Sequence, residues 1–325
     1  MTKQKTDIKH QWTYDGASLR LDQLLAKKFH GISRSYLQNL IHEQKVRVNG
    51  AFGKKGTVVH DQDVVSVDPF THPNDRVISS PNEPVLHIVA EKEHYLVIDK
   101  PAGLPTHPND FQDLQCVANH FIGLYPDSLH VGEDALRPGI VHRLDTYTSG
   151  LLIVAKTQEG FKAFRQLFDQ RNIQKTYQAL VLGNVYPDDI EIDTPLAHHH
   201  KNPRKMVALI DDRVEYRSKI REAKTMVHVR ERFDQTTWID VKTLTGRMHQ
   251  VRVHMASIDH PLVGDQVYQN QRQKQQDQYG LGRHFLHASK LVFIDPWTGL
   301  EIILRSNLPF ELQQCIDTIK KQAMV

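Results

Sequence analysis

One loop-like segment near the middle of the chain combines basic side chains with a single carboxylate. The segment Arg137-Pro-Gly-Ile-Val-His-Arg-Leu-Asp145 lies just before an apolar run at 151–155. A buried strand that holds a loop is a common support for active residues. Thr148-Ser-Gly150 can bond this loop back onto itself and allow a close backbone approach. Asp145 is therefore a candidate catalytic carboxylate, and a turn aspartate paired with Arg143 is the alternative.

A second polar cluster occupies the segment Thr245-Gly-Arg-Met-His-Gln-Val-Arg-Val-His254. It begins with a capping residue, and its spacing predicts a helix over 247–257. Arg247 would share one stripe of that helix with Gln250 and His254, while His249 and Arg252 would lie on neighbouring stripes. An exposed basic helix would also explain the pattern. The functional hypothesis is that Arg247 pairs with a carboxylate from another loop and lowers its pKa.

Motifs for several other chemistries are absent from the sequence or weak in it. The sequence contains no GxGxxG, GxxxxGK[ST] or GxSxG motif, which argues against dinucleotide, P-loop and α/β-hydrolase sites. The run at 198–200 is three histidines without metal-like spacing, so we predict a loop and no metal site. Cys116 and Cys315 suggest neither a disulfide nor a thiolate site. A glycosidase-like pair of distant acids stays open, because folding can bring any two acids together.

The composition is that of a globular chain with two domains. Its 325 residues are 39% hydrophobic and 24% charged, with 41 basic and 38 acidic residues and a net charge of +3. This length suits two domains. The polar N-terminus and the strand-sized apolar runs predict neither a signal peptide nor a membrane span. We expect a monomeric cytoplasmic protein.

The hydrophobic period changes along the chain and predicts where the domains begin and end. Residues 1–17 are expected to be a flexible leader, 18–68 a small unit of two helices and a sheet, and 69–84, with four prolines, a linker. Residues 85–325 would form an α+β domain with a mainly antiparallel sheet, because many strands occur without βαβ alternation. Within it, helices are expected near 112–124, 158–170 and 309–322, and an exposed Gln-rich insertion at 269–278.

The small N-terminal unit carries an excess of basic residues. Between residues 18 and 68 there are eight Lys or Arg and five Asp or Glu. The basic residues recur around the second predicted helix, which Ser33 can cap, and around the turn after it. This pattern favours a phosphate-binding face, and a solvated charged surface is the alternative.

Five sequence blocks, taken together and in order, resemble the RluA family of RNA pseudouridine synthases. The front unit resembles an S4 domain, a small RNA-binding module, through Arg20-Leu-Asp-Gln-Leu-Leu25, Ser33-Arg-Ser35 and Val46-Arg-Val-Asn-Gly50. The five blocks are Val97-Ile-Asp-Lys-Pro-Ala-Gly-Leu-Pro-Thr-His107; Arg137 to Asp145 with Thr148-Ser-Gly-Leu-Leu152; Lys175-Thr-Tyr177 with Ala179-Leu-Val181; Thr245 to His254 with Pro261-Leu-Val-Gly-Asp265 and Tyr268; and Leu286-His-Ala-Ser289 with Leu291.

The resemblance implies that the chain isomerises uridine to pseudouridine in RNA without a cofactor or metal. Asp145 would be the catalytic aspartate and Arg247 its partner. Tyr177, otherwise a half-buried strand residue, would stack on the uracil and help the proton step at C5, and Arg143 would fill the gap left in the RNA stack. Further candidate RNA contacts are Lys100, His142 and His249 in the catalytic domain and Arg34, Lys45 and Arg47 in the S4-like unit.

The resemblance leaves the RNA substrate open. Ribosomal RNA of the large subunit is the leading hypothesis, because of the S4-like unit. A transfer-RNA enzyme is the alternative within the family, and a non-catalytic RNA-binding factor for ribosome assembly is the alternative outside it. Thr146-Tyr147 replaces the Lys-Asp that often follows the aspartate in the family, which puts the substrate preference in doubt and not the catalysis.

Overall fold

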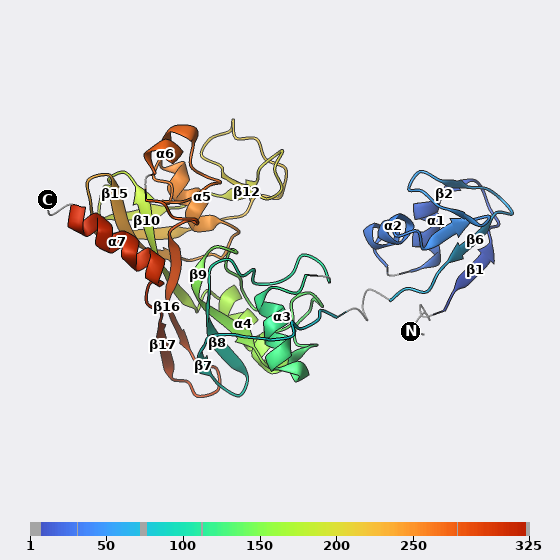
Figure 1. The fold of residues 1–325 in the computed structure, drawn as a ribbon, viewed down its shortest axis with the longest axis horizontal. Coiled ribbons are helices and arrows are strands. Elements are labelled where there is room, and N and C mark those ends of the chain that lie inside the picture. The colour runs from blue at the N-terminus through green and yellow to red at the C-terminus, as the bar shows by residue number, and fades with distance from the viewer. Residues whose placement is uncertain (1–7, 31, 72–76, 112, 278, 323–325) are drawn as a thin grey trace. The chain divides into compact units, whose positions relative to one another are not determined.

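The chain forms two compact units, residues 1–77 and 78–325, each with its own hydrophobic core (Figure 1). The computed structural model describes residues 8–30, 32–71, 77–111, 113–277 and 279–322. None of the helices in these ranges has the length and apolar composition needed to cross a bilayer.

The N-terminal unit packs two helices against a small sheet. Ser33 caps the second helix as predicted, because its hydroxyl accepts a hydrogen bond from the Tyr36 backbone N–H at 3.3 Å. The Asn49-Gly50 turn has positive φ at both residues, which these residue types adopt readily. The sheet has the order β1-β6-β3-β4, and β2 pairs with β5. The elements are β1 (His10–Thr13), β2 (Leu19–Arg20), α1 (Leu21–Lys28), α2 (Arg34–His42), β3 (Val46–Val48), β4 (Ala51–Phe52), β5 (Val58–Val59) and β6 (Val64–Val67).

The predicted flexible leader is wrong for its second half. Strand β1 pairs antiparallel with β6, and Trp12 packs against the core of the unit. Only one side chain of this short edge strand is strongly apolar, so the sequence shows no clear strand pattern. Residues 1–7 lie outside the described part of the chain.

The predicted linker at 69–84 is also partly structured. Ile78 is only 2% exposed and belongs to the core of the large unit, and Phe70 is buried in the core of the small one. The boundary between the two units lies between Val77 and Ile78. Residues 72–76 are outside the described ranges.

The large unit is built on a nine-stranded mixed sheet. Its order is β11-β14-β15-β10-β16-β9-β8-β7, with β17 alongside β16, and only β9 and β16 run parallel. This confirms the predicted α+β class. The elements are β7 (Ile88–Glu91), β8 (Tyr95–Lys100), α3 (Val117–Leu124), η2 (Pro126–Ser128), β9 (Ser149–Ala155), α4 (Gln158–Asp169), β10 (Gln174–Leu182), β11 (Asp189–Ile192), β12 (Leu196–His198), β13 (Met206–Ala208), β14 (Thr225–Arg232), β15 (Thr236–Thr243), α5 (Gln250–Ser257), α6 (Gln271–Gln276), β16 (Leu286–Ile294), β17 (Glu301–Arg305) and α7 (Phe310–Gln322).

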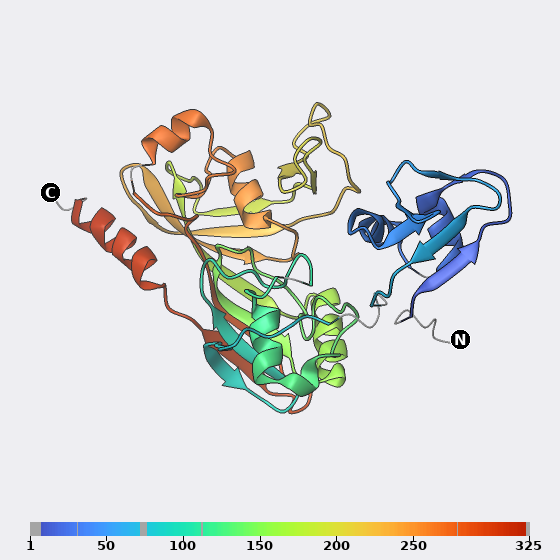
Figure 2. The same cartoon turned by 45° about the vertical axis from the view of Figure 1, so that its right-hand side comes forward.

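Strand β9 is buried on both faces, which explains its uninterrupted apolar sequence. Leu152 and Val154 pack in one core with Phe121 of α3, while Leu151 and Ile153 pack in another with the phenylalanines of α4. Figure 2 shows α3 and α4 beside the β7–β9 end of the sheet and α5 beside the opposite half. The loop that carries Asp145 leads directly into this rigid strand.

Three expected elements have different bounds. Helix α3 begins at Val117 and not near 112, and α5 begins at Gln250 and not at 247. His249 precedes α5 with a left-handed φ of 55°, so the backbone cannot continue as a helix through it. The Gln-rich segment is not only a loop, because Asn270 and Gln273 form a capping box that starts α6.

Candidate active site

The loop before β9 is fixed on both sides of Asp145. The Thr148 backbone N–H donates to the Asp145 carbonyl at 3.0 Å, which closes the turn. Thr106 bonds both backbone groups of Leu144, donating to its carbonyl at 2.8 Å and accepting from its N–H at 3.1 Å. The Thr148 hydroxyl lies 2.9 Å from a ring nitrogen of His284. The carboxylate is therefore presented by a rigid backbone.

Lys100 holds this loop through hydrogen bonds from its buried ammonium, and it is not available to RNA. Its side chain is fully buried, and its ammonium donates to the carbonyls of Pro101, Leu104 and Thr146 at 2.8, 2.8 and 3.0 Å. Burial lowers the pKa of Lys100 to about 7, whereas three carbonyl acceptors match the three hydrogens of its ammonium form. The prediction that Lys100 contacts substrate is wrong, because these bonds already occupy all of its donors.

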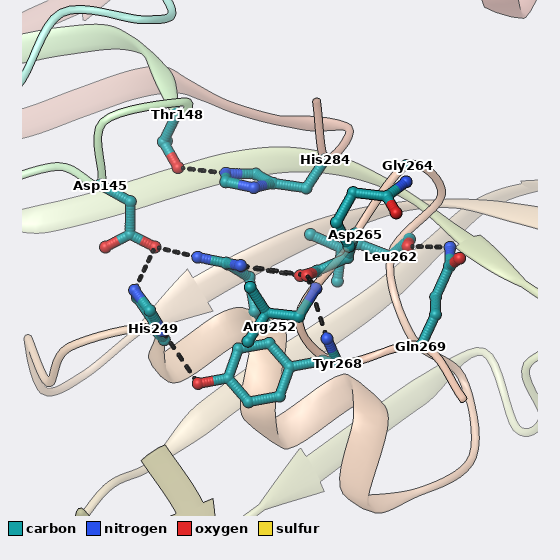
Figure 3. Close-up of polar contacts among 12 residues, drawn as sticks. Asp145, Thr148, His249, Arg252, Leu262, Gly264, Asp265, Tyr268, Gln269 and His284 are labelled. Carbon is teal, nitrogen blue, oxygen red and sulfur yellow. Dashed lines mark hydrogen bonds and ion pairs between the residues drawn. The ribbon is translucent and has the colours of Figure 1, made fainter. Parts of the chain in front are cut away.

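Arg252 is the ionic partner of Asp145. Its guanidinium donates from Nη1 to Asp145 at 3.1 Å and makes two bonds to Asp265, from Nε at 2.7 Å and from Nη2 at 3.0 Å (Figure 3). The side chains of Arg252 and Asp265 are 6% and 0% exposed, so this fork is shielded from water. Such a bidentate pair fixes the direction of the third donor, which points at Asp145.

The prediction that Arg247 pairs with Asp145 is therefore wrong, because Arg252 makes that contact. Arg247 lines the same cavity as Asp145, but its Nε donates to the backbone carbonyl of Glu222 at 2.9 Å. It precedes α5, while Arg252 lies inside the helix on its buried face. Because the helix was predicted to begin at 247, the prediction placed Arg247 and not Arg252 toward the loop. Asp265 was within a matched sequence block, and its spacing from Arg252 gave no signal of the contact.

His249 is the second polar neighbour of Asp145. Its Nε2 lies 3.8 Å from the carboxylate, and its Nδ1 lies 2.9 Å from the Tyr268 hydroxyl. That hydroxyl also accepts from the Met206 N–H at 3.0 Å. His249 therefore lies between the Asp145 carboxylate and the Tyr268 hydroxyl.

The surroundings keep Asp145 ionised. Burial would raise the pKa of its carboxyl, but His249 and His284 when they are protonated, and Arg252 through its charge and its hydrogen bond, more than offset this and lower it. Burial lowers the pKa of His249, and it lowers that of His284 to about 3. Both rings are then neutral at neutral pH, and Arg252 is the cation that persists.

Tyr177 and Asp145 line one small cavity of about 50 Å³, together with Arg143, Lys175, Arg247 and residues of the α5 start. The ring of Tyr177 is 8% exposed. Burial raises the pKa of Tyr177 to about 12, and the nearby Asp145 charge acts in the same direction. Its phenol is therefore protonated at neutral pH, and its aromatic ring lines the same cavity as the Asp145 carboxylate.

The other predicted contacts of this loop differ in their exposure. Arg143 is exposed, and its Nη1 lies 3.3 Å from a ring nitrogen of His107, so no ion pair ties it to Asp145. His142 is held inside, because its Nε2 accepts from the Ile153 N–H at 2.9 Å and its ring packs on Phe168 at 4.6 Å. The ring of His142 can border a substrate, but its Nε2 lone pair is already used.

In the N-terminal unit, the three predicted RNA contacts each pair with a carboxylate of the same unit. Arg34 bonds Asp22 at 2.8 Å, Arg47 bonds Asp68 at 2.6 Å, and Lys45 lies 3.1 Å from Glu43. Asp22 is fully buried and also receives Arg20 and Gln38. Lys27, Lys54 and Lys55 form no ion pair with any residue that the structure describes. Among the described residues, no group of His, Cys, Asp or Glu could hold a metal. The loop predicted at 198–200 is partly wrong, because His198 ends strand β12 and His199 forms a β-bridge with Tyr216.

Comparison with known proteins identifies the family. The RNA pseudouridylate synthase family model matches residues 94–257, and the S4 domain model matches residues 19–65. The chain is 35% identical over 308 residues to a protein of Nitrosomonas europaea named ribosomal large subunit pseudouridine synthase D, covering 94% of this chain and 85% of that one. It is 33% identical to a Yersinia pestis protein of the same name, covering 93% and 91% of the two chains.

A solved structure supports the fold. The human RNA pseudouridylate synthase domain containing 1 superposes with a TM-score of 0.57 at 22% identity, over 76% of this chain and 98% of that chain. The chain therefore belongs to the RNA pseudouridine synthase family, as an enzyme that converts uridine in RNA to pseudouridine and carries an S4 domain ahead of its catalytic domain.

Proposed function

We propose that this enzyme isomerises uridine in ribosomal RNA of the large subunit, with Asp145 as the catalytic group and without a cofactor. The observation that carries the proposal is the ionised Asp145 carboxylate, held by Arg252 in a cavity that Tyr177 also lines. An ionised carboxylate is the group that the reaction needs, because breaking a glycosidic bond develops positive charge on the sugar.

The isomerisation balances without any external reagent. The N1–C1′ bond of the uridine breaks, the uracil turns, and a C5–C1′ bond forms. The hydrogen on C5 leaves to solvent and N1 gains one, so neither electrons nor atoms must come from a cofactor. Asp145 would stabilise or attack the sugar carbon while the base is detached.

Tyr177 would serve as a stacking surface for the displaced uracil. Its phenol stays protonated at neutral pH, so it is not poised as a resting base for the C5 proton. Taking a base out of its stack costs a few kcal/mol, and an aromatic face together with a guanidinium offsets part of that cost. Arg143 is exposed at the edge of the cavity and can supply the guanidinium.

The names of two relatives favour ribosomal RNA over transfer RNA as the substrate. Both are named ribosomal large subunit pseudouridine synthase D, and they match this chain over more than nine-tenths of its length. Pseudouridine mapping in total RNA from cells with and without this gene tests the substrate. Loss confined to large-subunit ribosomal RNA is expected, and loss confined to transfer RNA would reject the ribosomal assignment.

Asp145→Asn tests the catalytic role. The amide keeps the size of the side chain but not its charge, so we expect tritium release from C5-tritiated large-subunit ribosomal RNA to disappear while RNA binding is retained. Asp240→Asn, which changes a half-buried carboxylate of β15 paired with Arg230, is the matched control and should release tritium normally. Normal release by Asp145→Asn would defeat the assignment.

A further inference from the structure

A second cavity adjoins the one that contains Asp145. It has a volume of about 370 Å³, and its lining includes the loop before β9, the end of α4, the start of β10 and the turn before α5. Arg143, Lys175, Thr245 and Arg247 line both cavities, so the two adjoin. We call this second cavity the basic pocket.

The basic pocket concentrates positive charge. One carboxylate, that of Asp169, lines it, against six cationic side chains: Arg137, Arg143, Arg165, Arg171, Lys175 and Arg247. Arg137 forms a long ion pair of 3.4 Å with Asp134, and both side chains are 49% exposed. Within the described ranges, the other five cations pair with no carboxylate.

Among the described residues that line the pocket, Asp169 is the one carboxylate, so the cluster keeps an excess of positive charge. Burial lowers the pKa of His107 at the rim, and the charges of Arg137 and Arg143 lower it further. Burial also lowers the pKa of Lys175, to about 8, which leaves its ammonium mostly charged at neutral pH. Like charges held together destabilise the folded state, so an anion from outside the chain would be bound favourably.

We propose that the basic pocket is a second RNA subsite, which binds phosphodiester groups of the strand next to the target uridine. Guanidinium forks match phosphate oxygens geometrically, and five arginines line this pocket. The proposal rests on the proposed function, since it takes the target uridine to lie at Asp145. Lys175 and Arg247 lie where the strand would pass from one cavity to the other.

Arg165→Gln/Arg171→Gln in the full-length chain tests the subsite. Both side chains are exposed and form no hydrogen bond within the described residues, so the fold should persist. The probe is a transcript of large-subunit ribosomal RNA that contains C5-tritiated uridine. We expect affinity to fall roughly tenfold and the log–log salt slope to decrease by about 1.4, because each phosphate contact on a single strand contributes about 0.7. The single-turnover rate at saturating enzyme should stay unchanged.

Lys162→Gln/Arg305→Gln is the matched control. Lys162 is exposed on α4 outside the basic pocket, and Arg305 is exposed on β17, so the change in net charge is the same. The control should bind RNA like the unmodified protein. An equal loss of affinity in the control would attribute the effect to overall charge and overturn the subsite, as would unchanged affinity and salt slope in Arg165→Gln/Arg171→Gln.

The two proposals fail in different ways. Tritium release by Asp145→Asn would reject the catalytic assignment and leave the binding measurement intact. Normal binding by the Arg165→Gln/Arg171→Gln variant, alongside an inactive Asp145→Asn, would reject only the subsite. A slower rate at saturating enzyme with unchanged affinity would also overturn the subsite, because the pocket would then shape the catalytic loop and not bind RNA.

Discussion

At the scale of single residues, the site depends on one guanidinium shared by two carboxylates. Arg252 bonds both oxygens of Asp265, which is inaccessible to water, and leaves one Nη1 donor for Asp145. Because Asp265 also accepts from the Val267 and Tyr268 N–H groups, its own position is fixed by the backbone. The direction of the Asp145 carboxylate is therefore set, through Arg252 and Asp265, by the backbone at Val267 and Tyr268.

We expect Arg252→Lys to lower the catalytic rate by about 100-fold or more, the size of effect seen when one preorganised electrostatic contact is lost. An ammonium keeps the charge but cannot bond both carboxylates in the same geometry. With weaker stabilisation of its ionised form, the pKa of Asp145 should rise, so activity lost on acidification should be lost at a higher pH. A pH–rate profile of tritium release measures both effects.

Arg247→Lys is the control for this prediction. Arg247 bonds a backbone carbonyl and not Asp145, so its replacement should leave the acid limb of the profile in place. A shift of the acid limb in Arg247→Lys but not in Arg252→Lys would restore the pairing expected from sequence and contradict the one seen in the structure.

The sequence identified the candidate carboxylate but not its partner. Asp145 stood out because a polar loop precedes a strongly apolar strand. Choosing between Arg247 and Arg252 required the start of α5, and that start depends on the left-handed backbone of His249. The turn is held by Gln250, whose side chain accepts from Thr245 and from the Arg247 N–H. Local spacing does not encode these bonds.

At the scale of elements, the parallel contact between β9 and β16 positions the loop that carries Asp145. Ser149 and Gly150 pair with His287 and Ala288, residues from distant parts of the sequence. Gly150 has a φ of +110°, and an added Cβ would overlap the backbone of Ala288. The close approach of the two strands therefore requires glycine at this position.

Gly150→Ala should destabilise the large unit by roughly 2–3 kcal/mol, since both the backbone conformation and the steric overlap oppose the change. The midpoint of urea unfolding measures this. Gly282→Ala is the control, because its φ is not in the left-handed region and its Cβ would have no neighbour within 4 Å. Equal midpoints for the two variants would show that β9 and β16 tolerate a wider spacing.

Strands with a repeated apolar or alternating side-chain pattern could be predicted from the sequence. Strands that form only because they pair with a neighbouring strand could not. The apolar or alternating runs of the large unit predict eight strands, and all eight occur. The predicted ranges are 86–90, 95–98, 151–155, 177–182, 225–229, 237–241, 286–293 and 300–304. β1, β11, β12 and β13 are short, and they are stabilised by neighbours such as β6 and β14. Propensity alone does not reveal such strands, since pairing supplies most of their stability.

At the scale of the whole molecule, both units carry basic side chains, but the carboxylates beside them differ. The cations of the catalytic domain gather at the basic pocket, whereas those of the S4 domain are partly neutralised by their own carboxylates. In the S4 domain, Lys54 and Lys55 line a cavity of about 460 Å³ beside α2 and β4. Lys27 and these two lysines are thus the S4 cations best placed to gain from a phosphate.

We expect deletion of residues 1–77 to weaken binding to large-subunit ribosomal RNA and to flatten its salt dependence, because phosphate contacts set that slope. Lys27→Gln/Lys54→Gln/Lys55→Gln in the full-length chain should reproduce most of the change without removing a folded unit.

The matched control for this lysine variant is Arg34→Gln/Lys45→Gln/Arg47→Gln. Ion pairs are lost as well in the control, so unfolding of the S4 domain should accompany any loss of affinity. Filter binding over a salt series, read beside thermal unfolding, separates the two. If the lysine variant keeps full affinity and slope while the deletion loses both, the S4 domain contributes through contacts other than these lysines.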